Sequence, residues 1–175
     1  EPILKAVADL KRSDDSKAIL FGPGGKKFNQ STAYRFSKVG HLIMICGRYE
    51  GVDERVSEYI ADEEISIGDY VLMGGEVPAM AVTECVSRLI PEVIGKEEFL
   101  KERMETESNA ALEYPQFTRP ASLKPADILS FEKYGDLKLK GKGLVDREWK
   151  VPDVLLSGDH KEIVKWKKEH GRTIR

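Results

Sequence analysis

Three short glycine-containing segments each follow directly on a run of apolar residues. They are residues 22–25 (GPGG), 47–51 (GRYEG) and 68–75 (GDYVLMGG). Glycine lets a backbone approach a ligand closely, and ligands of parallel α/β sheets bind in the crevice at the carboxyl ends of the strands. The pattern therefore indicates a binding crevice whose backbone amides and carbonyls can contact an adenine edge or a ribose.

Each segment also has a simpler structural explanation, and the residues alone leave both open. Taken alone, residues 22–25 fit a plain turn better than a phosphate loop, because their spacing matches neither GxGxxG nor the Walker motif. Residues 47–55 fit a polar loop followed by a capped, ion-paired helix, although a simple turn would not need Gly-Arg-Tyr-Glu-Gly at a strand end. Residues 66–76 fit two β-turns.

Other side chains with chemical potential give weaker signals. Arg88 lies four residues after Glu84, which on a helix predicts an exposed ion pair worth roughly 0.3 kcal/mol. The three histidines are His41, His160 and His170, and no His–Cys spacing resembles a zinc site. No Ser–His–Asp arrangement is visible in the sequence. We therefore predict no metal site and no catalytic triad.

Short apolar strands alternating with helices must position the three loops, and this alternation predicts an α/β body with a largely parallel sheet. Strands are expected at residues 17–21, 41–46 and 64–67, with an extended segment at 70–73. Helices are expected at residues 2–10, from Asn29 or Ser31 to about Lys38, at 52–60, at 76–90 and at 161–170. Residues 22–25 are expected to form a loop, because three glycines and a proline suit neither a helix nor a strand interior.

Composition excludes several classes of protein. Hydrophobic residues make up 41% and charged residues 33% of the 175 residues, which fits neither a disordered nor a membrane-spanning chain. No secretory leader is visible. Cys46 and Cys85 lie in apolar runs and are predicted to be buried thiols of a cytosolic protein. The net charge is -2.

Charge is distributed unevenly along the chain. Residues 1–119 hold 15 basic and 21 acidic side chains, whereas residues 120–175 hold 13 basic and 9 acidic ones. A basic segment attached to an acidic body suggests a polyanionic partner such as nucleic acid. A lysine-rich solvated surface is the simpler explanation from charge alone.

Five ordered motifs together resemble one enzyme family. They are residues 46–55 (CGRYEGVDER), 66–78 (SIGDYVLMGGEVP), 87–91 (SRLIP), 114–120 (YPQFTRP) and 151–159 (VPDVLLSGD). The chain is similar to the bacterial tRNA (guanine-N1)-methyltransferases that modify position 37, next to the anticodon. These enzymes belong to the trefoil-knotted methyltransferase class. The motifs cover most of the chain, and their combination is highly specific.

The resemblance implies a fold, a domain plan and partners that periodicity does not show. It implies a deep trefoil knot in an α/β domain at residues 1–94, a linker at 95–117 and a small, mainly helical, basic domain for tRNA at 118–175. It also implies a cytoplasmic homodimer with shared active sites and no membrane association. Relative to the family, we expect an amino-terminal strand and loop and the end of the carboxyl-terminal domain to be missing, and an insertion to lie within residues 122–150.

S-adenosyl-L-methionine is the cofactor that the resemblance implies. By the family pattern it would be surrounded by Leu20, Phe21, Gly22, Pro23, Gly25, Gly47, Arg48, Tyr49, Glu50, Ile67, Gly68, Asp69, Tyr70, Val71, Leu72, Gly74, Gly75 and Pro78. Backbone groups of Ile67, Gly68, Tyr70 and Leu72 would contact the adenine, and Tyr49 and Glu50 would lie near the ribose and methionine parts.

The resemblance assigns the catalytic roles to Arg88 and to an acidic residue of the linker. Guanine N1 must lose a proton before it can attack the methyl group, and a carboxylate is the natural base. A fixed guanidinium can stabilise the charge that develops on the exocyclic oxygen. The family reads Asp-Ser-Phe where this chain reads Glu107-Ser108-Asn109, so Glu107 is the candidate base and Glu105 its substitute. A solvated linker glutamate is the alternative.

Two other functions stay open at this point. One is an RNA-binding or dimerisation module that keeps the cofactor pocket and has lost catalysis. The other is a knotted methyltransferase acting on another RNA position.

Overall fold

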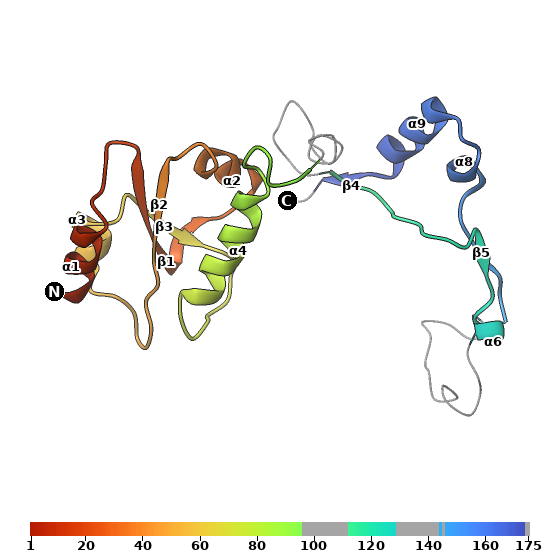
Figure 1. Ribbon diagram of the computed structural model, residues 1–175. Coiled ribbons are helices and arrows are strands. Elements are labelled where there is room, and N and C mark those ends of the chain that lie inside the picture. The colour runs from red at the N-terminus through yellow and green to blue at the C-terminus, as the bar shows by residue number, and fades with distance from the viewer. Residues whose placement is uncertain (96–111, 129–143, 145, 174–175) are drawn as a thin grey trace. The chain divides into compact units, whose positions relative to one another are not determined.

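The structure is a computed structural model that describes residues 1–95, 112–128, 144 and 146–173 (Figure 1). The chain divides into two compact units, Glu1–Ala111 and Leu112–Arg175. Each unit is described by itself. Glu105, Glu107 and the KLKGK stretch at 138–142 lie outside the described residues.

Three parallel strands form the sheet of the first unit. They are β1 (Ser16–Lys27), β2 (His41–Ile45) and β3 (Glu63–Ser66), and β1 lies between the other two. Ser16 pairs with His41 and Leu20 with Ile45 on one side of β1, while Ile19 pairs with Glu63 on the other. The predicted α/β body with a mostly parallel sheet is confirmed. The knot stays a prediction.

Helices cover both faces of this sheet (Figure 1). On one face, Ala18, Leu20, Ile43 and Ile45 pack against Val7 of α1 (Pro2–Asp9) and Val56 of α3 (Glu54–Tyr59). On the other face, Ile19, Phe21 and Ile65 pack against Phe36 of α2 (Gln30–Phe36) and against Val82 and Val86 of α4 (Glu76–Ser87). Successive strand residues point to opposite faces, which explains the continuous apolar runs of β1 and β2.

The prediction of a loop at residues 22–25 is wrong in part, because β1 continues through them to Lys27. Phe21 and Lys26 both pair with Ile65, so residues 22–25 are an excursion between two paired segments of one strand. A Cβ atom on Gly25 would lie 2.6 Å from the backbone N of Ile65. Glycine is therefore required where this excursion passes the backbone of β3.

The helix boundaries follow from the caps. Asn29, rather than Ser31, caps α2, because its Oδ1 accepts a hydrogen bond of 2.9 Å from the backbone N–H of Thr32. The helix at 52–60 shortens to α3, whose cap Asp53 accepts from the N–H of Arg55. Helix α4 ends at Ser87 and not at residue 90, before the turn that leads to Pro91.

Two further predictions need correction. Residues 70–73 belong to the loop between β3 and α4 and form no strand. Cys46 is exposed because it lies just beyond the end of β2, and Cys85 is only half-buried on α4. Burial still raises the pKa of both thiols, and at Cys46 the neighbouring Glu76 carboxylate adds to that rise.

The second unit combines short strands and helices. Strand β4 (Leu112–Glu113) pairs antiparallel with β7 (Arg172–Thr173), and β5 (Ser122–Leu123) pairs antiparallel with β6 (Trp149–Lys150). Its helices are α6 (Pro125–Ile128), α8 (Asp153–Leu156) and α9 (His160–His170). The predicted helix at 161–170 is confirmed as α9, whereas a mainly helical second domain stays a prediction.

No helix within the described residues combines the length and the apolar character that a membrane span requires.

Candidate functional site

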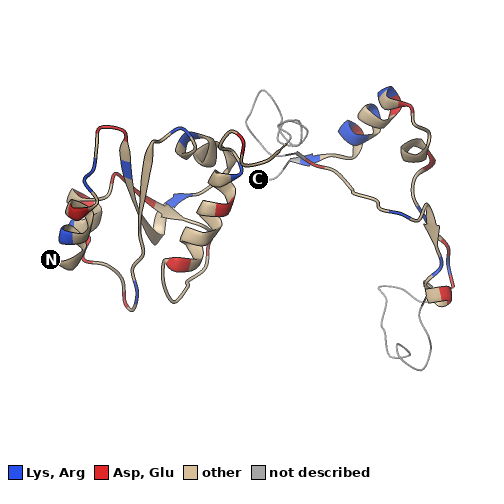
Figure 2. Cartoon of the chain, in the orientation of Figure 1, with Lys and Arg blue, Asp and Glu red and all other residues tan. Residues whose placement is uncertain are grey.

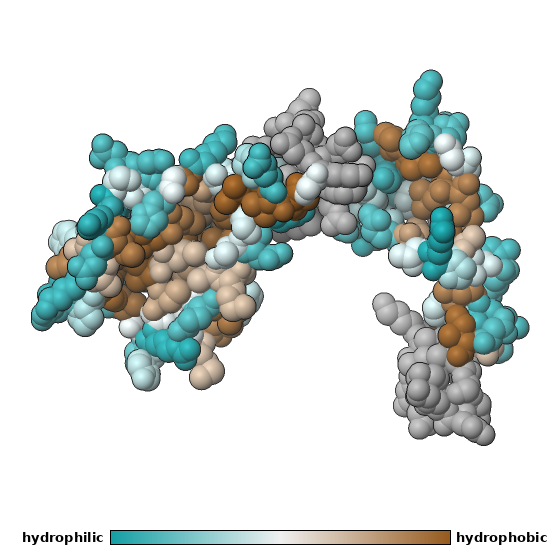
Figure 3. All heavy atoms as spheres, viewed as in Figure 1, coloured by the Kyte–Doolittle hydropathy of each residue, from teal (hydrophilic) through white to brown (hydrophobic). Residues whose placement is uncertain are grey.

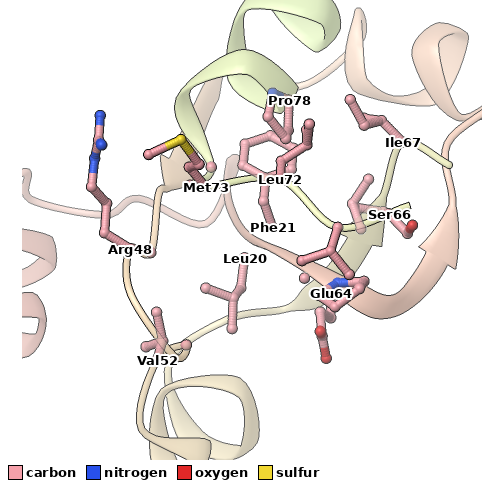
Figure 4. Close-up of a pocket in the computed structure, with 18 of the residues that line it drawn as sticks. Leu20, Phe21, Arg48, Val52, Glu64, Ser66, Ile67, Leu72, Met73 and Pro78 are labelled. Atoms are coloured by element: carbon pink, nitrogen blue, oxygen red, sulfur yellow. The ribbon is translucent and has the colours of Figure 1, made fainter. Parts of the chain in front are cut away.

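A pocket of about 280 Å³ lies at the carboxyl ends of the three parallel strands (Figure 4). Its walls come from the excursion of β1, the loop after β2, the first turns of α3, the end of β3 and the loop before α4. All the predicted cofactor residues line it except Gly25 and Asp69. Gly25 instead passes against the backbone of β3, and the Asp69 carboxylate forms an ion pair of 2.6 Å with Lys27.

Eight further residues line the pocket: Gly51, Val52, Glu54, Ser57, Glu64, Ile65, Ser66 and Met73. The period of two along β3 is the signal that would have found Glu64 and Ser66. Since Ile65 packs in the core, its two neighbours must point to the opposite face of the sheet. Glu54 and Ser57 lie three residues apart on α3 and so share one face of that helix.

The loops after β2 and before α4 run side by side as two adjoining walls of the pocket. The backbone N–H of Gly75 donates to the carbonyl of Gly47 at 2.9 Å, and Arg48 and Gly74 form an isolated antiparallel bridge. A Cβ atom on Gly74 would lie 3.1 Å from that same carbonyl oxygen. Glycine therefore allows the two backbones to meet.

An ion pair reinforces this junction on its outer side. Arg48 Nε lies 2.7 Å from Glu76 Oε1, at the first residue of α4. The hydrogen bond from Arg48 holds the pKa of Glu76 below its ordinary value. Figure 4 shows the Arg48 side chain extending away from the other labelled lining residues. The guanidinium is thus directed to Glu76 and contributes little positive charge to the pocket interior.

The loop after β3 is folded tightly around Ser66, which is buried. The Ser66 hydroxyl donates to the carbonyl of Gly68 at 3.0 Å, and the Tyr70 hydroxyl donates to the carbonyl of Ile67 at 3.3 Å. A side chain on Gly68 would collide with the Tyr70 ring. These contacts hold in place the backbone of residues 66–70, part of the segment for which adenine contacts are predicted.

Arg88 does not line this pocket. It caps the carboxyl end of α4, is half-buried and is not among the lining residues. The predicted i,i+4 ion pair between Glu84 and Arg88 does not form. Within the described residues, no group of three or more His, Cys, Asp or Glu side chains is arranged to hold a metal ion.

A second cavity, of about 870 Å³, lies within the second unit. Its wall carries aromatic and basic side chains together: Tyr114, Phe117, Arg119, Trp166 and Lys167. The rings of Phe117 and Trp166 pack edge to face with their centres 6.1 Å apart. Lys167 Nζ lies 4.6 Å from the centre of the Tyr114 ring. Figure 2 shows basic residues along α9, which contributes Trp166 and Lys167.

The sequence matches one family of known proteins. Residues 1–139 match the family model described as tRNA (Guanine-1)-methyltransferase TrmD. The chain is 47% identical over 169 residues to a tRNA (guanine-N(1)-)-methyltransferase of Dictyoglomus turgidum, a match that covers 97% of this chain and 58% of the relative.

Two further relatives of the same name show similar likeness. The protein of Dehalococcoides mccartyi is 43% identical over 179 residues, covering 100% of this chain and 62% of the relative. The protein of Clostridium beijerinckii is 45% identical over 168 residues, covering 96% of this chain and 59% of the relative. The chain therefore spans about three-fifths of the length of the relatives it matches.

Proposed function

Because the chain belongs to the tRNA (guanine-1)-methyltransferase TrmD family, we propose that it acts in the transfer of a methyl group to N1 of guanine in tRNA. The target is the guanine at position 37, next to the anticodon, and the methyl donor is S-adenosyl-L-methionine. The observation that carries the proposal is the pocket at the carboxyl ends of β1–β3, which is lined by nearly all the residues predicted to surround the cofactor.

The residues present fit this donor. Backbone groups of residues 67–72 supply donors and acceptors for an adenine edge, and Leu20, Phe21 and Pro78 supply apolar walls for its ring. Glycines at 47, 74 and 75 leave room for a bound ligand beside the backbone. When bound, S-adenosylmethionine supplies an activated methyl group on a sulfonium. The three loops would form the trefoil knot of the class.

Two side chains carry the chemistry on the guanine. Glu107 takes the N1 proton, and Glu105 is the nearest substitute. The Arg88 guanidinium stabilises negative charge that develops on the exocyclic oxygen. A base in a stack must be splayed out before it can react. Since Arg88 lies outside the pocket of its own chain, we infer that a partner subunit brings it to the site.

Exposed apolar side chains support a homodimer with shared active sites. Val71 and Met73 are each 86% exposed in the loop before α4, and Val77 and Met80 are 58% and 71% exposed on α4 itself. Figure 3 shows hydrophobic residues gathered over α4 on the face in view. A patch of this kind marks a protein interface more often than a free surface.

The second unit is the proposed tRNA-binding part. Lys161, Lys165, Lys167 and Lys168 lie on α9, and such basic side chains neutralise phosphates. Phe117 and Trp166 offer rings on which an unpaired base can stack.

Methyl transfer to tRNA transcripts tests the function directly. A transcript with guanine at position 37 should accept the methyl group, and the product nucleoside should be 1-methylguanosine. A transcript with adenine at that position is the control and should accept none. Calorimetry should show S-adenosylmethionine binding that Gly74→Val weakens about tenfold or more, since the added side chain meets the Gly47 carbonyl. Binding without methyl transfer would favour the non-catalytic RNA-binding module instead.

A further inference from the structure

We infer that Glu64 makes the pocket selective for a positively charged ligand, so that the methyl donor binds more tightly than the neutral product left after transfer. This inference rests on the proposed function. It assigns a specificity-determining role to a residue that the family pattern of cofactor positions did not include.

Glu64 and its neighbour Glu63 point to opposite faces of β3 and meet opposite environments. Glu63 is paired with two cations, because Arg35 donates to both of its carboxylate oxygens and Lys17 Nζ lies 2.9 Å from Oε1. Glu64 faces the pocket, and its carboxylate forms no hydrogen bond or ion pair with the described residues. One carboxylate is thus neutralised by the protein, while the other is left for a ligand.

The chain makes room for the Glu64 carboxylate at this position. A Cβ atom on Gly22 would collide with Glu64 Oε1, so the glycine of the β1 excursion leaves the space that the carboxylate fills. Leu20, opposite Glu64 in the sheet register, supplies an apolar wall. Figure 4 shows Glu64 beside the ribbon of β3 among the lining side chains. Half-buried charge is screened less by solvent than exposed charge.

No cation of the described lining balances this charge. The other charged lining residues are Glu50, Glu54 and Arg48, and the Arg48 guanidinium is engaged by Glu76. The lining therefore carries an excess of negative charge. An acidic pocket binds a cation more tightly than a neutral ligand of the same shape, because only the cation gains electrostatic binding free energy.

Methyl transfer changes the charge of the ligand at one atom. The bond from sulfur to the methyl carbon breaks, its electron pair stays on sulfur, and the guanine nitrogen bonds to the methyl carbon after losing its proton. The sulfonium becomes a neutral thioether, while the adenosine and amino-acid parts keep their charges. An acidic lining therefore favours the donor, S-adenosylmethionine, and weakens retention of the product, S-adenosylhomocysteine.

Calorimetric titration of the full chain with each of the two ligands tests the inference without measuring activity. The quantity is the ratio of the product's Kd to the donor's Kd. The wild type should bind the donor more tightly, and Glu64→Gln should lower the ratio by roughly three- to tenfold. Glu64→Asp keeps the charge and should keep most of the preference.

Two controls separate this effect from general charge and from misfolding. Glu58→Gln removes the same charge from an exposed position on α3 outside the pocket and should leave the ratio unchanged. In the wild type alone, raising the salt from about 0.05 M to about 0.5 M should lower the ratio, since screening weakens charge interactions.

The possible failures are distinguishable. If Glu64→Gln binds both ligands with the wild-type ratio, the inference is wrong and the proposed function stands. If the wild type binds neither ligand, the proposed function fails and the inference fails with it.

Discussion

A Cβ atom on Gly75 would lie 2.7 Å from the Cα of Cys46, so the loop before α4 and the loop after β2 meet backbone against backbone. Real side chains essentially never approach another backbone so closely. Because the nearest atoms are the Cα and Cβ of Cys46 and the backbone N of Gly47, a side chain at position 75 cannot be accommodated by a rotamer change. The junction of the two pocket walls therefore depends on this glycine.

Gly75→Ala should destabilise the chain by about 1–3 kcal/mol and weaken S-adenosylmethionine binding, since the added methyl forces the two walls apart. Urea unfolding followed by circular dichroism gives the first quantity and calorimetry the second. Gly24→Ala is the matched control, because a Cβ there has nothing within 4 Å. Equal losses in both variants would remove the close approach as the cause.

The ion pairs of Glu63 should make stability pH-dependent in acid. Its carboxylate is mostly buried, and the hydrogen bond from Arg35 lowers its pKa from 4.5 to about 2, with Lys17 adding to the shift. A carboxylate whose pKa falls on folding stabilises the folded state above the unfolded pKa. That contribution is lost as the pH falls from about 4.5 towards 2.

Glu63→Gln should therefore cost roughly 1–2 kcal/mol at pH 7, allowing for screening of the half-exposed Arg35, and progressively less below about pH 4.5. Urea unfolding between pH 7 and pH 3 measures this difference. Glu58→Gln, at an exposed position of α3, should change stability little at any pH. A Glu63→Gln loss that stays constant down to pH 3 would contradict the assignment.

Arg88→Ala should lower the single-turnover rate of tRNA methylation by about 10²–10³ while leaving S-adenosylmethionine affinity unchanged. The reason is that Arg88 is proposed to act on the guanine and lies outside the cofactor pocket of its chain. Arg55→Ala is the control, because Arg55 is exposed and pairs with Asp53 on α3. A wild-type rate in Arg88→Ala would show that the charge on the guanine oxygen is stabilised by other groups.

The chain should sediment at about twice its own mass at micromolar concentration. Met80→Glu should shift it towards the monomer, because the substitution puts a charge into the proposed apolar interface. Leu4→Glu introduces the same charge at an exposed leucine of α1 and should leave the dimer intact. A monomeric wild type at tens of micromolar would exclude a site shared between subunits at that concentration.

The part of the fold that sequence could predict is the part that depends on local patterns. The apolar run at 41–45 and the Asn29 cap identify a strand and a helix start from neighbouring residues alone. The pocket loops are recognisable because glycines and charges interrupt apolar runs. The knot stays a prediction from the family likeness, since nothing local specifies how a chain passes through its own loops.

The rest depends on contacts between segments distant in the sequence. Residues 22–25 continue β1 only because β3 lies alongside and pairs with both ends of the excursion. Glu63 and Glu64 are the same residue type, and their environments differ because Arg35 and Lys17 lie on the face of the sheet to which Glu63 points. The Arg48–Glu76 pair joins residues 28 positions apart, a separation that no local spacing rule covers.

Because Phe21 and Lys26 both pair with Ile65, the number of residues in the β1 excursion does not affect the register between β1 and β3. Residues can be added between Gly22 and Gly25 without sliding either paired segment along β3. A barrel or a hairpin in which every residue is paired lacks this freedom, since one added residue would turn each following side chain to the other face. Evolution can thus reshape this wall by insertion while the scaffold stays the same.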